Sequence, residues 1–274
     1  MIDNLKRNPD VDIFIYSHKD FTPLVSDHVF KVLTNCKAPI NTDLEVFRDY
    51  TGDNISDKNL MYNEYTGFYW LWKNYPLKKY IGLNHYRRYY LDDNNNVMQG
   101  KNMPIIGDIF KKHDIILNEK YPLMLSRGYA FNNRDWYAYW HNIEDFDIIG
   151  NIIRDKYTKY YDGFIKMSEV KYIYPSNLFI MNKDMFMEYC DFIFSLLMDF
   201  RKERGFFTTL DCVKYVENNK EKYIKNYSQY YDVNMQSRII GYLCERVLLS
   251  FLLTKRKDGT TIEDSAKFFK WKVF

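Results

Sequence analysis

The chain has 274 residues, 46% of them hydrophobic, which is ample for a large core in one domain or in a compact pair. Its formal net charge of +3 is too small to indicate nucleic-acid binding by itself, although it suits an anionic ligand. We expect a cytoplasmic protein without a zinc site, because no run approaches the ~18 apolar residues of a membrane helix, no signal peptide is apparent, and the four cysteines are widely spaced.

The first half of the chain alternates apolar runs with polar breaks. Residues 10–19 open with a β-rich run that breaks at a Ser-His-Lys tripeptide, as a first buried strand would. Residues 22–33 show helical spacing, with Pro23 near the start, where helices tolerate proline. The patterns predict strands over residues 10–19, 78–88 and 112–119, and helices over residues 22–33 and 63–74.

The second half is richer in helical patterns. Residues 142–161 are amphipathic at helical spacing, and residues 171–200 predict a strand, a turn, a second strand and a long helix. An apolar helix is predicted over residues 238–255. The last nine residues mix lysines with aromatic side chains, a composition found at membrane surfaces. The alternative is a terminal strand or helix that docks on the core.

Strands that alternate with helices imply an α/β sheet with helices on both faces, and we expect one domain over residues 1–274. Ligands in such sheets bind outside the carboxyl ends of the strands. Three of the predicted strands end in polar groups, at residues 17–19, 84–88 and 118–119. If these strands are parallel neighbours, the three groups converge on one cleft.

His85, Arg87 and Arg88 stand at the end of the strand predicted over residues 78–88. Arginine is always charged and presents a planar fork of donors that suits phosphate oxygens. Two arginines and a histidine at a strand end would therefore suit a diphosphate. The alternative is a structural arginine pair bound to nearby acids such as Asp92 and Asp93.

Four polar residues, Asn54, Lys58, Asn59 and Glu64, surround the start of the aromatic helix. A helix N-terminus with spare amides and a lysine is a ready anion site. The alternative is plain capping chemistry, with a neighbouring Ser or Asp as the N-cap and the other side chains solvated.

Two helical segments carry further candidates. His141 and Asp145 are four residues apart and would share one helix face, where a carboxylate beside a histidine can act in proton transfer. A surface pair is the alternative. Charges in the late apolar helix are costly unless they are paired. We assign Glu245 to a buried ion network and Arg238 to the cleft.

Two Asp-x-Asp triplets formally match an acidic metal-binding motif, at residues 10–12 and 145–147. A triplet that holds a metal against a diphosphate would have to follow an apolar strand, and neither triplet does. The sequence therefore gives no well-placed metal ligands, and a requirement for manganese or magnesium is left open.

Taken together, these segments resemble a bacterial family long labelled a domain of unknown function and found in capsule, exopolysaccharide and O-antigen clusters. The joint spacing of the aromatic helix and the His-Tyr-Arg-Arg strand carries the resemblance, which extends from residue 12 to about residue 253. The matching segments are DNISDKNLMYNEYTGFYWLWKN, YIGLNHYRRYY, HNIEDFDIIGNIIRDKY, YPSNLFIMNKDMFMEYCDFIF and QSRIIGYLCERVLLSFLL.

The resemblance implies a glycosyltransferase with a GT-A-like nucleotide-binding α/β fold. It implies a UDP-sugar donor, with UDP-galactose as the first candidate, and a glycan or lipid-linked acceptor. Residues 1–120 would mainly bind the nucleotide sugar, and residues 121–274 would form the acceptor side and the C-terminal helices. In place of the acidic triplet of GT-A enzymes, this chain has the cationic strand end, so we hypothesise that fixed arginines neutralise the diphosphate.

Roles for single residues follow from the resemblance. Asp145 is the first candidate for the base that deprotonates the acceptor, with His141 beside it and Glu119 in reserve. We expect contacts with uridine or phosphate from His18, Lys58 and Asn59, and a sugar contact from Asn177. The full set expected to bind the donor is His18, Asn54, Lys58, Asn59, Glu64, Asn84, His85, Arg87, Arg88, Asn177 and Arg238.

Two other functions explain part of the pattern. A non-catalytic module that binds nucleotide sugars or carbohydrate would use the same cations and aromatic rings but would need no base. An RNA-binding protein would use the basic and aromatic content, but no RNA-binding motif is present, so we expect no nucleic-acid partner. A lipid-linked acceptor would bring the protein to the inner face of the plasma membrane.

Overall fold

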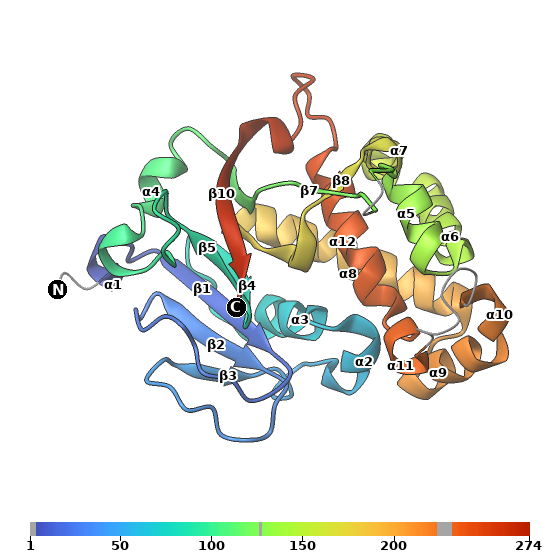
Figure 1. Cartoon of the computed structure of the whole chain (residues 1–274), viewed down its shortest axis with the longest axis horizontal. Helices are drawn as coiled ribbons and strands as arrows, with labels where there is room; N and C mark the ends of the chain where they lie inside the picture. Colours follow the sequence, from blue (N-terminus) through green and yellow to red (C-terminus); the bar gives the residue numbers. More distant parts are fainter. Residues whose placement is uncertain (1–3, 126–127, 224–231) are drawn as a thin grey trace.

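The computed structural model describes residues 4–125, 128–223 and 232–274. Within these ranges the main sheet has eight strands in the order β3-β2-β1-β4-β5-β10-β6-β9, with a further pairing between β4 and β9 (Figure 1). Its strands are β1 Val11–Ser17, β2 Phe30–Thr34, β3 Val46–Arg48, β4 Tyr80–His85, β5 Arg88–Leu91, β6 Ile115–Asn118, β9 Phe179–Asn182 and β10 Ala266–Val273. Strands β7 Tyr121–Pro122 and β8 Tyr172–Ile173 form a separate antiparallel pair.

The directions of the strands bring three polar strand ends to one edge of the sheet. Strand β1 is parallel to both of its neighbours, β2 and β4. Strands β4 and β6 are both antiparallel to β9, which lies between them, so β6 runs in the same direction as β4. The predicted arrangement is therefore confirmed for β1 and β4, whereas β6 has the right direction but is not their neighbour.

Helices make up most of the second half of the chain (Figure 1). The α-helices are α1 Asn4–Arg7, α2 Asn59–Tyr62, α3 Tyr65–Asn74, α4 Ile106–Ile109, α5 Asn133–Trp140, α6 Ile143–Lys156, α7 Tyr161–Glu169, α8 Lys183–Arg204, α9 Thr209–Asn218, α10 Lys220–Tyr223, α11 Val233–Gln236 and α12 Ile239–Leu252. Short 3₁₀ turns are η1 Ser56–Lys58, η2 Gly100–Asn102, η3 Thr158–Tyr160, η4 Pro175–Asn177 and η6 Glu263–Ser265. None of the helices in the described ranges is long and apolar enough to cross a membrane.

The two faces of the sheet are covered differently. On one face, strand residues such as Phe14 and Leu83 join a core with residues of α3, α8 and α12. On the other face, Ile13 and Ile180 pack against loop residues and Ile106 of the short helix α4. The α/β fold is confirmed, but the helices are concentrated on one face, and loops cover much of the other.

The ends of the long helix α8 follow from its sequence. The Asn182 side chain accepts a hydrogen bond from the backbone N–H of Met185, which caps the first turn. Gly205 ends the helix in the left-handed conformation, with φ of 72°, which glycine adopts without a steric penalty. The helices predicted over residues 63–74, 142–161 and 238–255 are present as α3, α6 and α12, and the strand, turn, strand and long helix predicted over residues 171–200 are present as β8, η4, β9 and α8.

Two elements differ from the prediction. Residues 22–33 do not form a helix; they form a loop that enters β2, where Phe30 pairs with Ile13 of β1. Buried β2 needs apolar residues on both of its faces, and such a run imitates helical spacing in a short window. The strand predicted over residues 78–88 ends at His85, and Arg88 begins the antiparallel strand β5.

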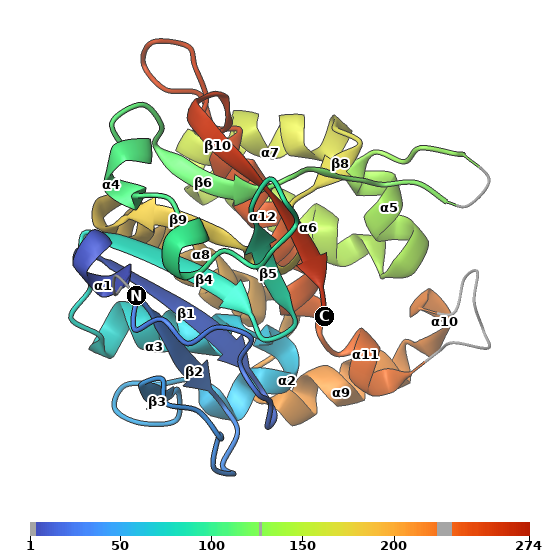
Figure 2. The same cartoon turned by 60° about the vertical axis from the view of Figure 1, so that its left-hand side comes forward.

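The lysine- and aromatic-rich tail is strand β10 of the sheet. It lies between β5 and β6, antiparallel to the first and parallel to the second, and Figure 2 shows it running alongside both strands. This confirms the alternative that the tail docks on the core, and the mixed composition is explained by a strand at which partly buried and exposed side chains alternate irregularly.

Candidate functional site

A cavity of about 430 Å³ lies at the carboxyl ends of β1 and β4. Its walls come from segments far apart in the sequence: the end of β1, the α2–α3 region, the β4–β5 turn, η4 and the start of α12. Seven residues expected to bind a donor line it, namely His18, Asn59, Glu64, His85, Arg87, Arg88 and Arg238. Both halves of the chain therefore contribute to the cavity.

The three arginines of the cavity form no ion pair with any residue that the structure describes. Arg87 is exposed, and its guanidinium lies 5.0 Å from the centre of the Tyr86 ring. The Nε atoms of Arg88 and Arg238 are buried and have no hydrogen-bond partner in the described part of the chain. The alternative pairing of Arg87 and Arg88 with nearby acids is thus not observed, and Asp92 instead accepts backbone N–H groups of its own turn.

Two neutral histidines stand among these cations. Burial, together with the charges of Arg88 and Arg87, lowers the pKa of His85 to about 3. Burial also lowers the pKa of His18, with Arg238 adding to the effect. Nδ1 of His85 accepts the backbone N–H of Arg87 at 3.3 Å, so the proton of the neutral ring belongs on Nε2. Neutral histidine can donate a hydrogen bond to an anion without adding to the charge repulsion.

Two carboxyl groups face the same cavity. Glu64 accepts a 2.7 Å hydrogen bond from Nδ2 of Asn177, and burial raises its pKa to about 7. Glu245 accepts the backbone N–H of Ser176 at 3.0 Å and pairs with Arg246 at 3.1 Å. The ion network expected for Glu245 is present, but this residue also lines the cavity.

A buried hydrogen-bond network fixes the floor of the cavity. The Tyr16 hydroxyl lies 3.1 Å from Oδ2 of Asp49 and 2.9 Å from the Thr66 hydroxyl, and it accepts a 2.7 Å bond from Nδ2 of Asn59. A side chain on Gly67 would meet the Tyr16 ring at 2.6 Å, so glycine is needed for this approach of α3 to β1. Asn59 is thereby held in one orientation.

The turn η4 stores backbone strain at the rim of the cavity. Ser176 and Asn177 both adopt positive φ, at 67° and 52°. Non-glycine residues in this region cost free energy and cluster at functional sites. The turn directs the Ser176 N–H to Glu245 and the Asn177 amide to Glu64, so both carboxyl groups are held by the same strained segment.

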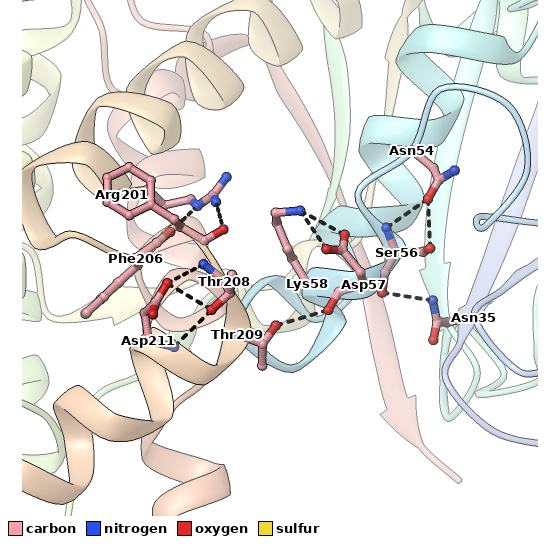
Figure 3. Close-up of polar contacts among 11 residues, drawn as sticks. Asn35, Asn54, Ser56, Asp57, Lys58, Arg201, Phe206, Thr208, Thr209 and Asp211 are labelled. Atoms are coloured by element: carbon pink, nitrogen blue, oxygen red, sulfur yellow. Dashed lines mark hydrogen bonds and ion pairs between the residues drawn. The ribbon is translucent and has the colours of Figure 1, made fainter.

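Four residues expected to bind the donor do not line the cavity. Figure 3 shows Asn54 and Lys58 in local contacts, where Asn54 accepts bonds from Ser56 and Lys58 pairs with Asp57 at 2.8 Å. The capping alternative is not observed either, because no side chain caps η1, α2 or α3; the polar groups of Asn54 and Lys58 bond within the local turn. The side chain of Asn84 faces a small apolar cavity on the other side of the sheet. Asn177 does not line the cavity, but its side-chain amide donates a hydrogen bond to Glu64, which does.

The residues expected to deprotonate the acceptor lie outside the cavity. His141 and Asp145 do not share a helix, because the Asn142 side chain accepts the N–H of Glu144 and starts the new helix α6. Asp145 is fully buried and pairs with Arg204 at 2.6 Å. His141 stacks at 4.0 Å on Tyr242, with its pKa lowered to about 3 by burial.

Glu119, the reserve candidate for the base, is exposed at the end of β6 and also lies outside the cavity. Strand β9 separates β6 from β4, so the third polar strand end is displaced from the other two. None of the three candidates for the base, Asp145, His141 and Glu119, lines the cavity with the donor-binding candidates.

Seven lining residues were not singled out for the cavity: Tyr16, Leu60, Asn63, Ser176, Gly241, Tyr242 and Glu245. Glu245 gave a signal in the sequence, as a charge within an apolar helix. The others depend on how α12 meets the α2 region. A side chain on Gly241 would meet the Asn63 amide at 2.1 Å, so this glycine permits the close approach.

No group of three or more His, Cys, Asp or Glu side chains in the described ranges is arranged to hold a metal ion. The triplet at residues 10–12 lies at the amino end of β1, away from the cavity, and its Asp12 pairs with Lys78 at 3.0 Å. The triplet at residues 145–147 lies on α6. Neither triplet stands where a metal would meet an anion in the cavity.

Comparisons with known proteins place the chain in a family. The apo structure of the bifunctional glycosyltransferase WbbM is similar to this chain, with a TM-score of 0.71 and 24% sequence identity over 96% of this chain and 45% of that chain. The likeness shows a shared fold with less than half of the larger protein. Comparison with curated proteins gives no match. A family model described as "Domain of unknown function (DUF4422)" matches residues 12–211, and the chain belongs to this family.

Proposed function

We propose that the protein is a glycosyltransferase that transfers a hexose from a UDP-sugar to a glycan or lipid-linked acceptor during the synthesis of bacterial surface polysaccharide. The similar fold of part of WbbM, a bifunctional glycosyltransferase, supports transfer chemistry. UDP-galactose is the first donor to test, on the resemblance described above. A lipid-linked acceptor would bring the protein to the inner face of the plasma membrane.

One observation carries the proposal: Arg87, Arg88 and Arg238 converge on one cavity at the carboxyl ends of parallel strands without ion-pair partners among the described residues. Charged groups that the fold does not neutralise are costly, and a bound anion would remove that cost. A diphosphate offers several oxygens to several guanidinium forks, which bind such groups bidentately. Parallel sheets bind nucleotides at this edge.

The cavity suits the chemistry of a sugar transfer in its size and its polarity. Its volume of about 430 Å³ falls within the usual range of small-molecule sites. When the bond between the sugar and the diphosphate breaks, negative charge develops on the leaving diphosphate. Fixed guanidinium groups and the neutral donor His85 can stabilise this charge with no reorganisation at the moment of reaction.

A panel of nucleotide sugars tests the proposal. We expect a UDP-sugar to raise the melting temperature and to release UDP slowly, even with water as the only acceptor. The measurement is repeated with manganese and with a chelator, because fixed arginines should sustain release without added metal. Binding without release of UDP would indicate a non-catalytic module. If the protein neither binds a nucleotide sugar nor releases UDP, the proposal is contradicted.

A further inference from the structure

Glu64 and Glu245 both face the cavity, but their surroundings differ. Glu245 is committed to Arg246 and to the backbone N–H of Ser176. Glu64 forms no ion pair with a residue in the described ranges, and its Oε1 accepts one neutral amide N–H, from Asn177. Glu64 is therefore the cavity carboxyl whose charge the fold compensates least. It is half-buried, and it shares the cavity with Arg87, Arg88 and Arg238, which we call the cationic wall.

Several ionisable groups surround Glu64, from each element packed against it. Its pKa is raised to about 7: burial is the largest cause and the charge of Glu245 adds to it, while the backbone N–H of Glu64, the Asn177 amide and the charge of Arg88 counteract the increase. The remaining neighbours are the phenols of Tyr16, Tyr65 and Tyr189 and the thiol of Cys244, whose raised pKa values keep them neutral. Glu64 can thus hold or release a proton near neutral pH, as a general base requires.

Resting on the proposed function, we propose that Glu64 is the general base that deprotonates the acceptor hydroxyl. The acceptor oxygen forms a bond to the anomeric carbon while its proton passes to a carboxylate oxygen of Glu64. The bond from the anomeric carbon to the diphosphate oxygen breaks, and its electron pair stays on the diphosphate, beside Arg87 and Arg88. Glu64 then returns its proton to solvent, which completes the cycle.

The other candidates for a base are less suited. His85, with a pKa of about 3, is a weak base at neutral pH. Glu245 is tied to Arg246, and Asp145 is paired with Arg204 outside the cavity. A base must also come within hydrogen-bond reach of the acceptor, which a carboxyl on the cavity wall can do and a residue in the core cannot.

Asn177 is a positioning residue for Glu64. Its Oδ1 accepts a 2.9 Å hydrogen bond from the Tyr65 hydroxyl, so its Nδ2 is left to point at the carboxyl. The Tyr65 hydroxyl in turn lies 2.6 Å from that of Tyr189. This chain of buried groups fixes which oxygen of Glu64 is occupied by the amide.

The test measures UDP release from UDP-galactose, or from the most active sugar of the panel, across pH with water as the acceptor. For the unchanged protein, kcat/KM should rise with pH through a limb near pH 7. Glu64→Gln should lose 10²–10⁴-fold in rate and should lose the limb, while calorimetry shows that UDP still binds. Glu64→Asp, with a shorter carboxyl, should keep the limb at a reduced rate.

Two neighbouring variants should move the limb in opposite directions. Glu245→Gln removes a like charge, so the limb should shift to lower pH. Asn177→Gly removes the amide donor and suits the positive φ at this position, so the limb should shift to higher pH. Glu217→Gln, on the exposed side of α9, is the matched control and should change neither rate nor limb.

The outcomes separate the inference from the proposed function. If the unchanged protein releases UDP and Glu64→Gln does so at the same rate with the same limb, Glu64 is not the base, and the transferase proposal stands. If both Glu64→Gln and Glu64→Asp lack a folded near-UV circular dichroism spectrum, an unmoved limb in Glu245→Gln and Asn177→Gly overturns the inference. If no nucleotide sugar binds or reacts, the proposed function fails, and the inference fails with it.

Discussion

The cavity and the α6–α8 contact both place arginine near carboxyl groups, but they treat the charges differently. Between α6 and α8, Arg204 lies 2.6 Å from Asp145 and 3.5 Å from Glu144. Burial would lower the pKa of Arg204, but the charge of Asp145 raises it overall. In the cavity, burial lowers the pKa of Arg88, and the neighbouring charge of Arg87 lowers it further. The fold supplies an ion-pair partner in one region and, among the described residues, none in the other.

The largest effect is expected from removing the paired arginine. Arg204→Met leaves Asp145 buried without its partner, which should cost about 3–5 kcal/mol of unfolding free energy. Urea denaturation measures this loss directly. The double variant Arg204→Met with Asp145→Asn removes both charges and should recover much of it. Equal stability of the single and the unchanged protein would show that the pair does not carry the structural role given to it here.

Arg88→Ala should reduce turnover and leave stability intact, whereas Arg204→Met should reduce stability. On the proposed function Arg88→Ala removes a donor for the leaving diphosphate, so turnover in the UDP-release assay should fall about a hundredfold, equivalent to about 3 kcal/mol of transition-state stabilisation. Its melting temperature should stay the same or rise, because an uncompensated buried charge is removed. A variant with normal turnover and reduced stability would instead place Arg88 with Arg204 among the structural arginines.

The sequence predicted one of these regions better than the other, for a physical reason. His85, Arg87 and Arg88 stand at the carboxyl end of β4 and the turn after it, and the edge at which a parallel strand ends is fixed by the sheet, so their place could be predicted. The position of Asp145 was predicted wrongly because the Asn142 cap starts a new helix between His141 and Asp145. A spacing of four residues therefore does not place these two side chains on one helix face. Local spacing predicts a face only within an unbroken helix.

The far wall of the cavity could not be predicted from local patterns at all. Tyr242 and Glu245 reach this wall because α12 packs against α2, whose residues lie about 180 positions earlier in the chain. A side chain at position 241 would meet Asn63, so glycine at this position allows the close approach. The same holds for β2, where pairing with β1 overrides the helical spacing of the isolated segment. Tertiary contacts decide both cases, and the sequence pattern of each segment alone does not contain them.

The pH dependence of stability distinguishes the carboxyl groups of the two regions. The folded pKa of Glu64, about 7, lies above its ordinary value near 4.5, so its ionisation opposes folding as pH rises from about 4.5 to above 7. Glu64→Gln should therefore stabilise the protein by about 3 kcal/mol at pH 8 and have little effect at pH 4. Denaturant titrations at the two pH values measure this difference.

Glu144 provides the contrasting case in that experiment. The hydrogen bond from Lys222 lowers its pKa, so its contribution to stability is present above about pH 4.5 and is lost as pH falls. Glu144→Gln should slightly destabilise the protein at pH 8, by less than about 1 kcal/mol for an exposed pair. Shifts of the same sign in both glutamate variants would contradict the contrast between the regions.

Lys58→Ala should have the smallest effect and shows where the cationic wall ends. Lys58 directly precedes the cavity-lining donor-binding candidate Asn59, yet its ammonium is turned to Asp57 and does not line the cavity. An exposed pair of this kind contributes less than about 1 kcal/mol, so stability should barely change. UDP release should stay within about twofold of normal, since the charge is screened by solvent at this position. A tenfold loss would extend the anion site to the start of α2.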